Sequence, residues 1–511
     1  MTPSFNLLDE PWLPVRLQDG QVQNMGLLEV FARSNDITSL AETAPPSLVA
    51  QYRLLLAITH RALTQGLTRW TDTDRAQWYH NGLPLDVIQH YLEHWRERFW
   101  LFHQEHPFMQ VAALAESPET RDKKKPWTQI SLAAASGNTP VMFDHATDTA
   151  PTTIRSAEAI RALLGFLQFT PGGLVKVLRA SDKAGALANS AAALPVGNTL
   201  CQTLILALHA APAAADDLPA WEQSPPTIKP LRDSPTLATG PNDRYTRLSR
   251  AVLFIKEEDD HIRWLHFAAG LALEEDTNAP DPMASYRASK DKLIRLTFNE
   301  GRALWRDLPV LVPTGRGQAA AVLDSAINLH AAISFDDVYQ PVLVAGLCSD
   351  QAKLLRWRAE QIALPCSLIT EPDKAQFLAL QIERSESLFT DLRILATSML
   401  ADTLPDSSSK DTRTRARSIV DAGPLGTSYF AAAERKLSPL MELIAGGDFG
   451  LANNYWNTAL RSSAQQAWLE LNKVMGRSAQ ALRAMARYEG RLHALLNKQV
   501  PREKELIETE T

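Results

Sequence analysis

Two histidines have the residue type and the spacing that could begin a metal site. His103 and His106 lie three residues apart, but Pro107 interrupts any helix that would present both on one face, and no second cluster of ligands lies nearby. The alternative is a capped helix end that is packed by Phe108 and Met109. The sequence favours this alternative and predicts no bound metal.

Covalent or metal-dependent catalysis has no recognisable motif in this chain. The sequence contains no nucleophile elbow, phosphate-binding P-loop, HExxH helix or paired-carboxylate motif. Its cysteines, Cys201, Cys348 and Cys366, are far apart and form no CxxC pair, so neither a disulfide framework nor a cysteine-based zinc site is expected. The sequence predicts no cofactor and does not favour an enzyme.

Three groups of basic residues could contact phosphates instead. Lysine and arginine side chains neutralise DNA phosphates in a salt-dependent way. In the last predicted helix, arginines recur every four residues on one face, opposite apolar residues that include Leu482 and Leu492. A solvated charged surface is the alternative for the lysine run and for the arginines of the last helix. The groups are Lys123, Lys124 and Lys125; Arg287, Lys290 and Lys292; and Arg483, Arg487 and Arg491.

An N-terminal run, Phe5–Val15, resembles the opening of the CasA family, whose members are the large subunits of type I-E CRISPR Cascade complexes. Taken alone, the run could be an edge strand, because Pro11 and Pro14 cannot donate hydrogen bonds to a sheet. Glu105–Gln110 also resembles a segment of the family, and the two matches come in the family's order. The ordered pair favours family membership over an unrelated edge strand.

The resemblance implies that a loop at Ser136–His145 lies near the point where DNA enters, and that it helps to read the protospacer-adjacent motif (PAM). Phe143, Asp144 and His145 are its candidate contacts. An apolar ring such as that of Phe143 can wedge between bases or stack on them. The alternative is a loop phenylalanine that docks on its own protein.

Further positions correspond to family residues that face the minor groove of the PAM duplex. Gly172 and Gly173 stand where the family has a glycine loop, and glycine lets the backbone approach a ligand closely because it has no Cβ. A plain turn is the alternative. Arg263 corresponds by local alignment to a lysine of the family that probes this groove, and arginine is favoured in a narrow minor groove.

The hairpin Gly346–Lys353 contains the most specific internal match. In the family, a glutamine at the hairpin tip acts as a wedge that splits the first base pair beside the PAM, and Gln351 matches it, between Asp350 and Ala352. An amide can hydrogen-bond exposed base edges while its bulk prevents re-pairing. Asp350 departs from the asparagine of the family, and phosphates repel a carboxylate. The alternative is an ordinary hairpin with Ser-Asp turn chemistry.

Length and charge are compatible with such a subunit. A chain of 511 residues is too long for one hydrophobic core. Its 52 basic and 58 acidic residues give a net charge of −6, which argues against non-specific coating of nucleic acid but permits local basic patches. No apolar run reaches the ~20 residues of a membrane helix, and no signal peptide is evident, so a cytoplasmic location is expected.

The helices and strands that the sequence predicts around these candidate residues indicate an α+β protein. A large mixed domain is predicted over residues 1–367, with buried strands at Val252–Ile255 and Val310–Val312. An all-α four-helix bundle is predicted over residues 368–511.

The bundle has clear start and stop signals. Its first helix is predicted to begin at Thr370–Asp373, where Pro372 suits the first turn, and to end before a charged loop over Asp402–Arg417. Pro439 is expected to kink the next helix or to mark a break near its start. The later helices are predicted near residues 428–446, 451–475 and 478–498.

The resemblance therefore implies a non-catalytic subunit that recognises the PAM in double-stranded DNA, helps to start unwinding and R-loop formation, and recruits a helicase-nuclease in antiviral defence. Its expected partners are the backbone, small and guide-handle-binding subunits of Cascade, the 5′ handle of the guide RNA and the target DNA, with no membrane. The alternatives are a nuclease subunit with an unrecognised active site and a helical scaffold without DNA contacts.

Overall fold

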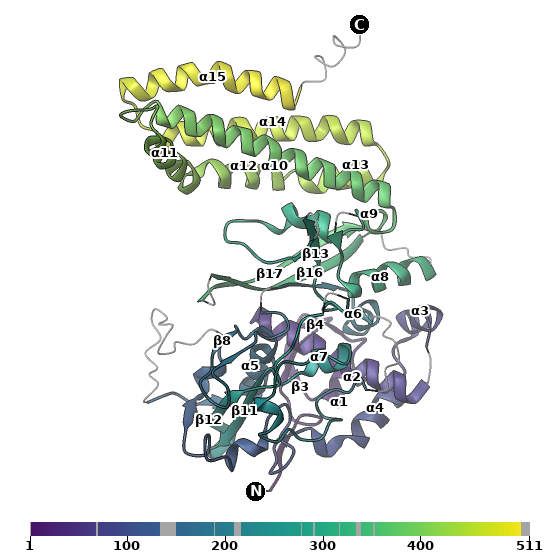
Figure 1. The fold of residues 1–511 in the computed structure, drawn as a ribbon. Helices are drawn as coiled ribbons and strands as arrows, with labels where there is room; N and C mark the ends of the chain where they lie inside the picture. Colours follow the sequence, from purple (N-terminus) through teal and green to yellow (C-terminus); the bar gives the residue numbers. More distant parts are fainter. Residues whose placement is uncertain are drawn as a thin grey trace. The chain divides into compact units, whose positions relative to one another are not determined.

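The computed structural model divides the chain into two compact units (Figure 1). The first comprises Met1–Glu300 and Gln318–Ala363, and the second comprises Gly301–Gly317 and Leu364–Thr511. The division into two domains between residues 367 and 368 stays a prediction. The structure describes residues 2–67, 70–132, 150–188, 190–208, 216–276, 278–289, 292–315, 317–333, 339–350 and 353–501.

The first unit is built around the long helix α2 (Pro45–Leu67). Almost every residue from Pro45 to Leu63 is buried, as is typical of a helix in a domain interior. Neighbouring helices pack around it in the first unit. The other helices of this unit are α1 (Leu27–Ala32), α3 (Asp72–Asn81), α4 (Leu85–His94), α5 (Ser156–Phe169), α6 (Leu200–Ala207), α7 (Pro241–Thr246) and α8 (Ala321–Ala332).

A buried ion pair joins α2 to a loop that is distant in sequence. Arg53 Nη2 lies 2.9 Å from Asp281 Oδ2, and both side chains are fully buried. The Arg53 guanidinium also lies 4.4 Å from the ring centroid of Tyr245. Burial alone would raise the pKa of Asp281, but the charges of Arg53 and Arg244 outweigh it and hold this pKa below its usual value. Asp281 is therefore ionised at neutral pH.

Short antiparallel sheets carry most of the described candidate residues of the first unit. β12 (His261–Ala269) pairs with β11 (Arg250–Lys256), with β6 (Lys124–Pro126) and with β7 (Ile154–Arg155). The predicted strand at Val252–Ile255 is confirmed as part of β11. The other strands are β1 (Ser4–Asn6), β2 (Leu13–Leu17), β3 (Val22–Met25), β4 (Ile37–Leu40), β5 (Trp100–Phe102), β8 (Gly173–Leu174), β9 (Ser181–Asp182), β10 (Ala191–Pro195), β13 (Tyr286–Ser289), β14 (Lys292–Arg295), β15 (Gly317–Gln318), β16 (Tyr339–Asp350) and β17 (Lys353–Pro365).

The N-terminal run Phe5–Val15 begins as an edge strand, because β1 pairs only with β5 among the described strands, and it ends in the interior of a second sheet. β2 is the middle strand between β3 and β4, and the side chains of Leu7 and Trp12 are fully buried. The indole nitrogen of Trp12 donates to the carbonyl of Leu7 at 3.0 Å. Pro14 is tolerated in a middle strand because it lacks only the donor, and its carbonyl still accepts from the amide of Ala41 at 2.7 Å.

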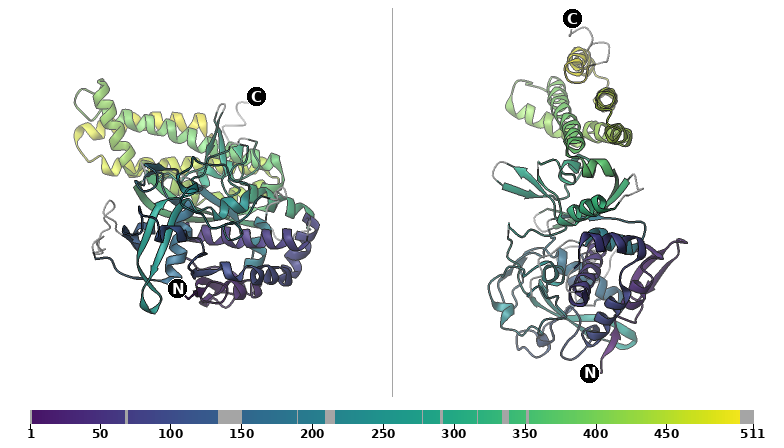
Figure 2. Two further views of the ribbon diagram at one scale, coloured as in Figure 1. Left: turned by 60° about the horizontal axis from the view of Figure 1, so that its bottom comes forward. Right: turned by 90° about the vertical axis from the view of Figure 1, so that its right-hand side faces the viewer.

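The second unit is helical, and its long helices run side by side in Figure 1 and are seen nearly end-on in the right-hand view of Figure 2. α10 (Pro372–Ala401) begins with Pro372 in its first turn, as predicted. The predicted α+β class, with a helical C-terminal region, is confirmed. The other helices are α9 (Cys366–Thr370), α11 (Lys410–Ala422), α12 (Pro424–Glu434), α13 (Leu437–Ala445), α14 (Phe449–Val474) and α15 (Ala479–Gln499).

The loop predicted over Asp402–Arg417 is too long. α11 already begins at Lys410, because the Ser409 side chain caps it by accepting from the amide of Thr412 at 3.1 Å. A serine at this position satisfies an amide that has no partner inside the helix. The charged residues that suggested a loop therefore lie on the exposed side of a short helix.

The helix predicted near residues 428–446 is two helices, α12 and α13, which are separated at Arg435–Lys436. Pro439 lies in the first turn of α13, where its missing N–H removes no helical hydrogen bond. The expected break near Pro439 is confirmed, three residues before the proline itself.

The strand predicted at Val310–Val312 is wrong. Leu304–Val310 form a 3₁₀ helix whose Trp305 side chain is buried. Arg306 fixes this segment to α10, because its Nε donates to Glu386 Oε1 at 2.6 Å. The apolar run is buried as expected, but a short buried run does not by itself distinguish a strand from a helical segment.

Candidate nucleic-acid interface

The sheet around β12 carries the first group of predicted phosphate contacts. Lys124 and Lys125 lie on β6, where Lys125 pairs with Leu265 of β12. The side chains of Lys123, Lys124 and Lys125 are all exposed. Because β6 is an outer strand of this sheet, Lys124 and Lys125 lie at an exposed sheet edge, and Lys123 directly precedes it.

The same sheet holds both described flanks of the predicted entry loop. Upstream, Pro126 pairs with Trp264, and downstream Ile154 pairs with Ile262. These two pairings lie on either side of Arg263, so the flanks of the loop are held next to the predicted minor-groove residue. The candidates Phe143, Asp144 and His145 lie within residues 133–149, outside the described residues.

The guanidinium of Arg263 is held by contacts within the protein. Its Nε lies 3.2 Å from Glu257 Oε1, and its Nη1 donates to the carbonyl of Pro151 at 2.5 Å. The side chain is still 37% exposed. A contact between Arg263 and DNA therefore has to share or replace these bonds.

Gly172 lies between α5 and the small hairpin of β8 and β9, and Gly173 is the first residue of β8, where it pairs with Asp182. Gly173 has a φ of +148°, which other residues rarely adopt, and a Cβ on Gly172 would lie 3.1 Å from the amide nitrogen of Ala184. Both glycines are exposed. The local backbone thus favours glycine at both positions, which is compatible with a plain turn as well as with a DNA contact.

The strands that flank the predicted wedge are present. β16 ends at Asp350, and β17, its neighbour in the sheet, begins at Lys353. On its other side β16 approaches β10 so closely that a Cβ on Gly346 would lie 2.5 Å from the carbonyl oxygen of Ser190. Gln351 and Ala352 lie between the two strands and outside the described residues.

The second basic group lies on the β13–β14 hairpin. Ser289 pairs with Lys292, and Arg287 is two residues before Ser289, so the side chains of Arg287 and Lys292 point to the same face of the hairpin. Both side chains are exposed. Lys290 lies outside the described residues.

The third basic group lies on α15, in the second unit. Arg483, Arg487 and Arg491 are exposed on one face as predicted. Arg487 Nη1 lies 3.1 Å from Asp402 Oδ2, and the Arg491 guanidinium lies 4.6 Å from the ring centroid of Tyr488.

The apolar side of α15 differs from the prediction at one position. Leu482 is 53% exposed. The buried residues follow helical spacing from Ala481 through Tyr488 to Leu496, and this spacing places Leu482 beside the buried stripe and not within it.

The two histidines follow a strand, so the predicted helix end is wrong. His103 comes directly after β5, and its Nδ1 accepts from the amides of Glu105 and His106 at 3.1 and 2.9 Å. Phe108 and Met109 are buried as expected. Across the described ranges, no group of three or more His, Cys, Asp or Glu side chains is placed to hold a metal ion, and no helix there is long and apolar enough to cross a membrane.

A buried ion pair that the sequence did not indicate lies beside the glycine loop. Arg250 Nη1 lies 3.2 Å from Asp182 Oδ2, with the side chains 3% and 0% exposed. Burial lowers the pKa of Arg250, and Asp182 offsets part of this effect. Charged residues are rarely buried without a partner, but no local pattern indicates which charges a fold will bury.

Comparison with solved structures defines the class of protein. The fold is that of CasA/Cse1 proteins: the crystal structure of CasA from Thermus thermophilus is 30% identical, with a TM-score of 0.83 over 97% of this chain and 100% of that one. The structure of Thermobifida fusca Cse1 has a TM-score of 0.77 at 23% identity, over 98% of each chain. A chain of a structure described as a CRISPR RNA-guided surveillance complex has a TM-score of 0.76 at 23% identity, over 96% of this chain and 100% of that one.

The sequence comparisons agree with the fold. The family model for CRISPR-associated protein Cse1 matches residues 6–468. CRISPR-associated protein CasA/Cse1 of Thermus thermophilus is 33% identical over 509 residues, which cover 97% of this chain and 98% of the relative. The chain therefore belongs to the Cse1 family, and the resemblance to CasA inferred from its sequence is confirmed.

Proposed function

We propose that this chain is the non-catalytic large subunit of a type I-E Cascade surveillance complex that acts in antiviral defence. Its membership of the Cse1 family supports this function. The observation that carries the DNA-binding part of the proposal is the sheet around β12. There, exposed lysines, Arg263 and both described flanks of the predicted entry loop come together.

In this function the subunit reads the PAM in double-stranded DNA. Lysines neutralise phosphates, glycines and an arginine face the minor groove, and an amide wedge separates the first base pair. The guide RNA supplies target specificity by base pairing, while the protein reads only the short flanking motif, as in other RNA-guided effectors. The proposed PAM contacts are Phe143, Asp144, His145, Gly172, Gly173, Arg263, Asp350, Gln351 and Ala352, and the proposed backbone contacts are the three basic groups.

The proposed partners follow from the same role. They are the backbone, small and guide-handle-binding subunits, the 5′ handle of the guide RNA, the target duplex and a helicase-nuclease that is recruited after the R-loop forms. The subunit biases DNA opening and does not cut. The helicase-nuclease supplies the cleavage.

The direct test compares the assembled complex with and without this chain. Because the motif is unknown, a duplex library with randomised flanking positions first identifies it. The complete complex should then bind the motif duplex at least about tenfold more tightly than a motif-free duplex, a difference of about 1.4 kcal/mol, and should lose this preference without the chain. Equal binding of both duplexes by the complete complex contradicts PAM recognition. DNA cleavage by the pure chain with Mg²⁺ or Mn²⁺ contradicts a non-catalytic role.

Alanine at Lys123, Lys124 and Lys125 together should weaken DNA binding to a similar extent for motif and motif-free duplexes. The reason is that phosphate contacts carry no sequence information. The slope of log affinity against log salt should fall by about 0.9 for each contact that is lost, and so by up to about 2.7. Gel shifts over a salt series measure this slope.

The charge-matched control replaces three exposed cations outside the candidate groups, Arg16, Lys229 and Lys436, by alanine. An equal change of the salt slope in both variants would show that the three lysines are only part of a solvated charged surface.

A further inference from the structure

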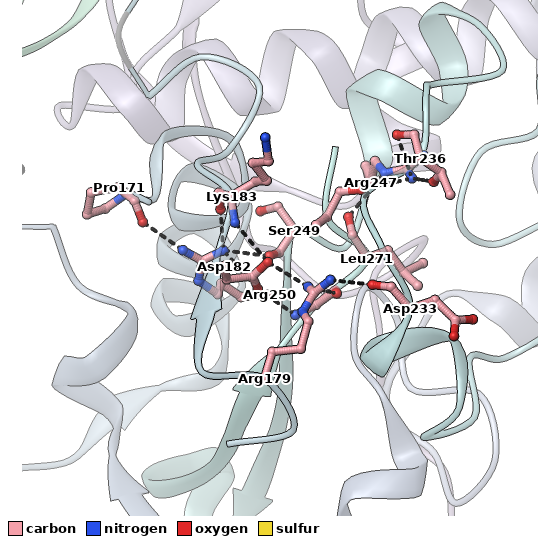
Figure 3. Close-up of polar contacts among 12 residues, drawn as sticks. Pro171, Arg179, Asp182, Lys183, Asp233, Thr236, Arg247, Ser249, Arg250 and Leu271 are labelled. Carbon is pink, nitrogen blue, oxygen red and sulfur yellow. Dashed lines mark hydrogen bonds and ion pairs between the residues drawn. The ribbon is translucent and has the colours of Figure 1, made fainter. Parts of the chain in front are cut away.

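Asp182 is a fully buried carboxylate beside the glycine loop, and the structure surrounds it with donors (Figure 3). Arg179 Nη2 donates to its Oδ1 at 2.6 Å, and Arg250 Nη1 lies 3.2 Å from its Oδ2. The amides of Lys183 and Gly270 also donate to it, each at 2.9 Å. These donors satisfy both oxygens of the carboxylate. Asp182 is therefore held in place, and it orients the guanidinium groups of Arg179 and Arg250.

Arg250 connects Asp182 to the glycine loop by hydrogen bonds. Its Nη2 donates to the carbonyl of Pro171 at 2.6 Å, and its Nη1 donates to the carbonyls of Lys183 and Ser249, each at 2.8 Å. Figure 3 shows the Arg250 guanidinium between Pro171 and Asp182. Pro171 directly precedes Gly172, so one buried guanidinium joins the residue that enters the loop to the residue that follows β9.

Arg179 ties the same hairpin to neighbouring backbone. Its Nη1 donates to the carbonyl of Asp233 at 2.7 Å and its Nη2 to that of Gly270 at 2.7 Å. The backbone near Gly270 leaves no room for adjustment, since a Cβ there would lie 2.3 Å from the carbonyl oxygen of Leu248. The β8–β9 hairpin is therefore held by Arg250 at the residues that flank it, and by Arg179 in the segment between its two strands.

We infer that Asp182 and Arg250 are positioning residues that hold Gly172 and Gly173 in place before DNA arrives. This inference rests on the proposed PAM recognition, and it adds the buried pair on which the glycine loop depends. Neither residue has to contact DNA. A free loop with two exposed glycines would lose conformational entropy when it binds DNA. Asp182 and Arg250 restrict this loop beforehand and so reduce that entropic cost of binding.

Arg250→Lys tests this role in the assembled complex. Lysine keeps the positive charge next to Asp182, but one ammonium group cannot reproduce a planar guanidinium that spans the carbonyls of Pro171 and Lys183. The ratio of affinities for motif and motif-free duplexes should fall about tenfold or more, as expected for the loss of a charge-assisted hydrogen bond. Binding to a single-stranded target, which contains no motif duplex, should change less than about twofold.

Arg75→Lys is the matched control. Arg75 is also buried, and its Nη2 donates to the carbonyls of Ile205, Leu206 and Ser325 at 2.9, 3.2 and 3.1 Å, while its Nη1 bonds to Asp72. Its substitution should reduce stability without changing the affinity ratio. The inference is overturned if Arg250→Lys retains the affinity ratio of the wild type, or if both variants lose this ratio equally. In either case a wild-type complex that prefers the motif duplex leaves the proposed function intact. A wild-type complex without any preference overturns both.

Hydrogen exchange of the wild-type complex gives a second test that needs no variant. If the buried pair positions the loop in advance, the hydrogen-bonded amides on either side of it should exchange slowly, and to a similar extent, with and without the motif duplex. These amides are that of Lys183, which donates to Asp182 Oδ1 at 2.9 Å, and that of Gly185, which donates to the carbonyl of Thr170 at 2.8 Å. Fast exchange in the free complex that becomes slow only on DNA binding would show that DNA and not the buried pair orders the loop, which overturns the inference.

Discussion

A complex that carries Gln351→Ala is expected to assemble normally and to form R-loops at least about tenfold more slowly on linear target DNA, a change of about 1.4 kcal/mol in the activation free energy. The physical reason is that the amide both hydrogen-bonds exposed base edges and occupies the space into which the first base pair would re-form. Alanine removes both effects. The rate of R-loop formation, followed by strand-specific fluorescence, measures the change.

The control for this variant is Gln361→Ala. Gln361 is an exposed glutamine on β17, on the same hairpin strand but away from the tip, so its substitution should leave the rate unchanged. A target that is already unpaired at the first positions should restore the rate of Gln351→Ala, because the step that needs the wedge is bypassed. Unchanged R-loop rates in Gln351→Ala on fully paired DNA would show that the wedge assignment is wrong.

The largest expected loss of stability follows from Asp281→Asn. The substitution leaves the Arg53 guanidinium fully buried without its counter-charge, and breaking a buried ion pair in this way typically costs about 3–5 kcal/mol. Chemical denaturation of the full chain should show an earlier transition for the first unit. Glu29→Gln, which removes an exposed pair with Arg33 on the same unit, should change stability by no more than about 1 kcal/mol.

The same pair gives a pH dependence with a definite sign. The pKa of Asp281 is lowered in the folded state, so its contribution is present above the unfolded value of about 3.9 and is lost as the pH falls through the lower folded value. The stability difference between wild type and Asp281→Asn should therefore be constant near neutral pH and shrink below about pH 4. A difference that persists unchanged in strong acid would contradict an ionised Asp281.

The local sequence determined the elements whose signals are contained within a few residues. The strand at Val252–Ile255 follows from a short apolar run, and the helix start at Pro372 and the break near Pro439 follow from proline chemistry. The run Phe5–Val15 also identified the family, and it is an edge strand only at its start, since among the described strands β1 pairs with β5 alone while β2 is a middle strand.

Only the tertiary structure decided which side chains the fold brings together. The run Val310–Val312 is apolar and buried, but it forms the end of a 3₁₀ helix and the turn that follows, and not a strand. The pairings that hold Pro126 and Ile154 on either side of Arg263 link segments that are distant along the chain. Arg250 reaches Pro171 across 79 residues, and such a partner is selected by burial and geometry in the folded state and not by any local pattern. The sequence therefore determined the family and the candidate loops, while the buried ion pair beside Gly172 emerged only from the fold.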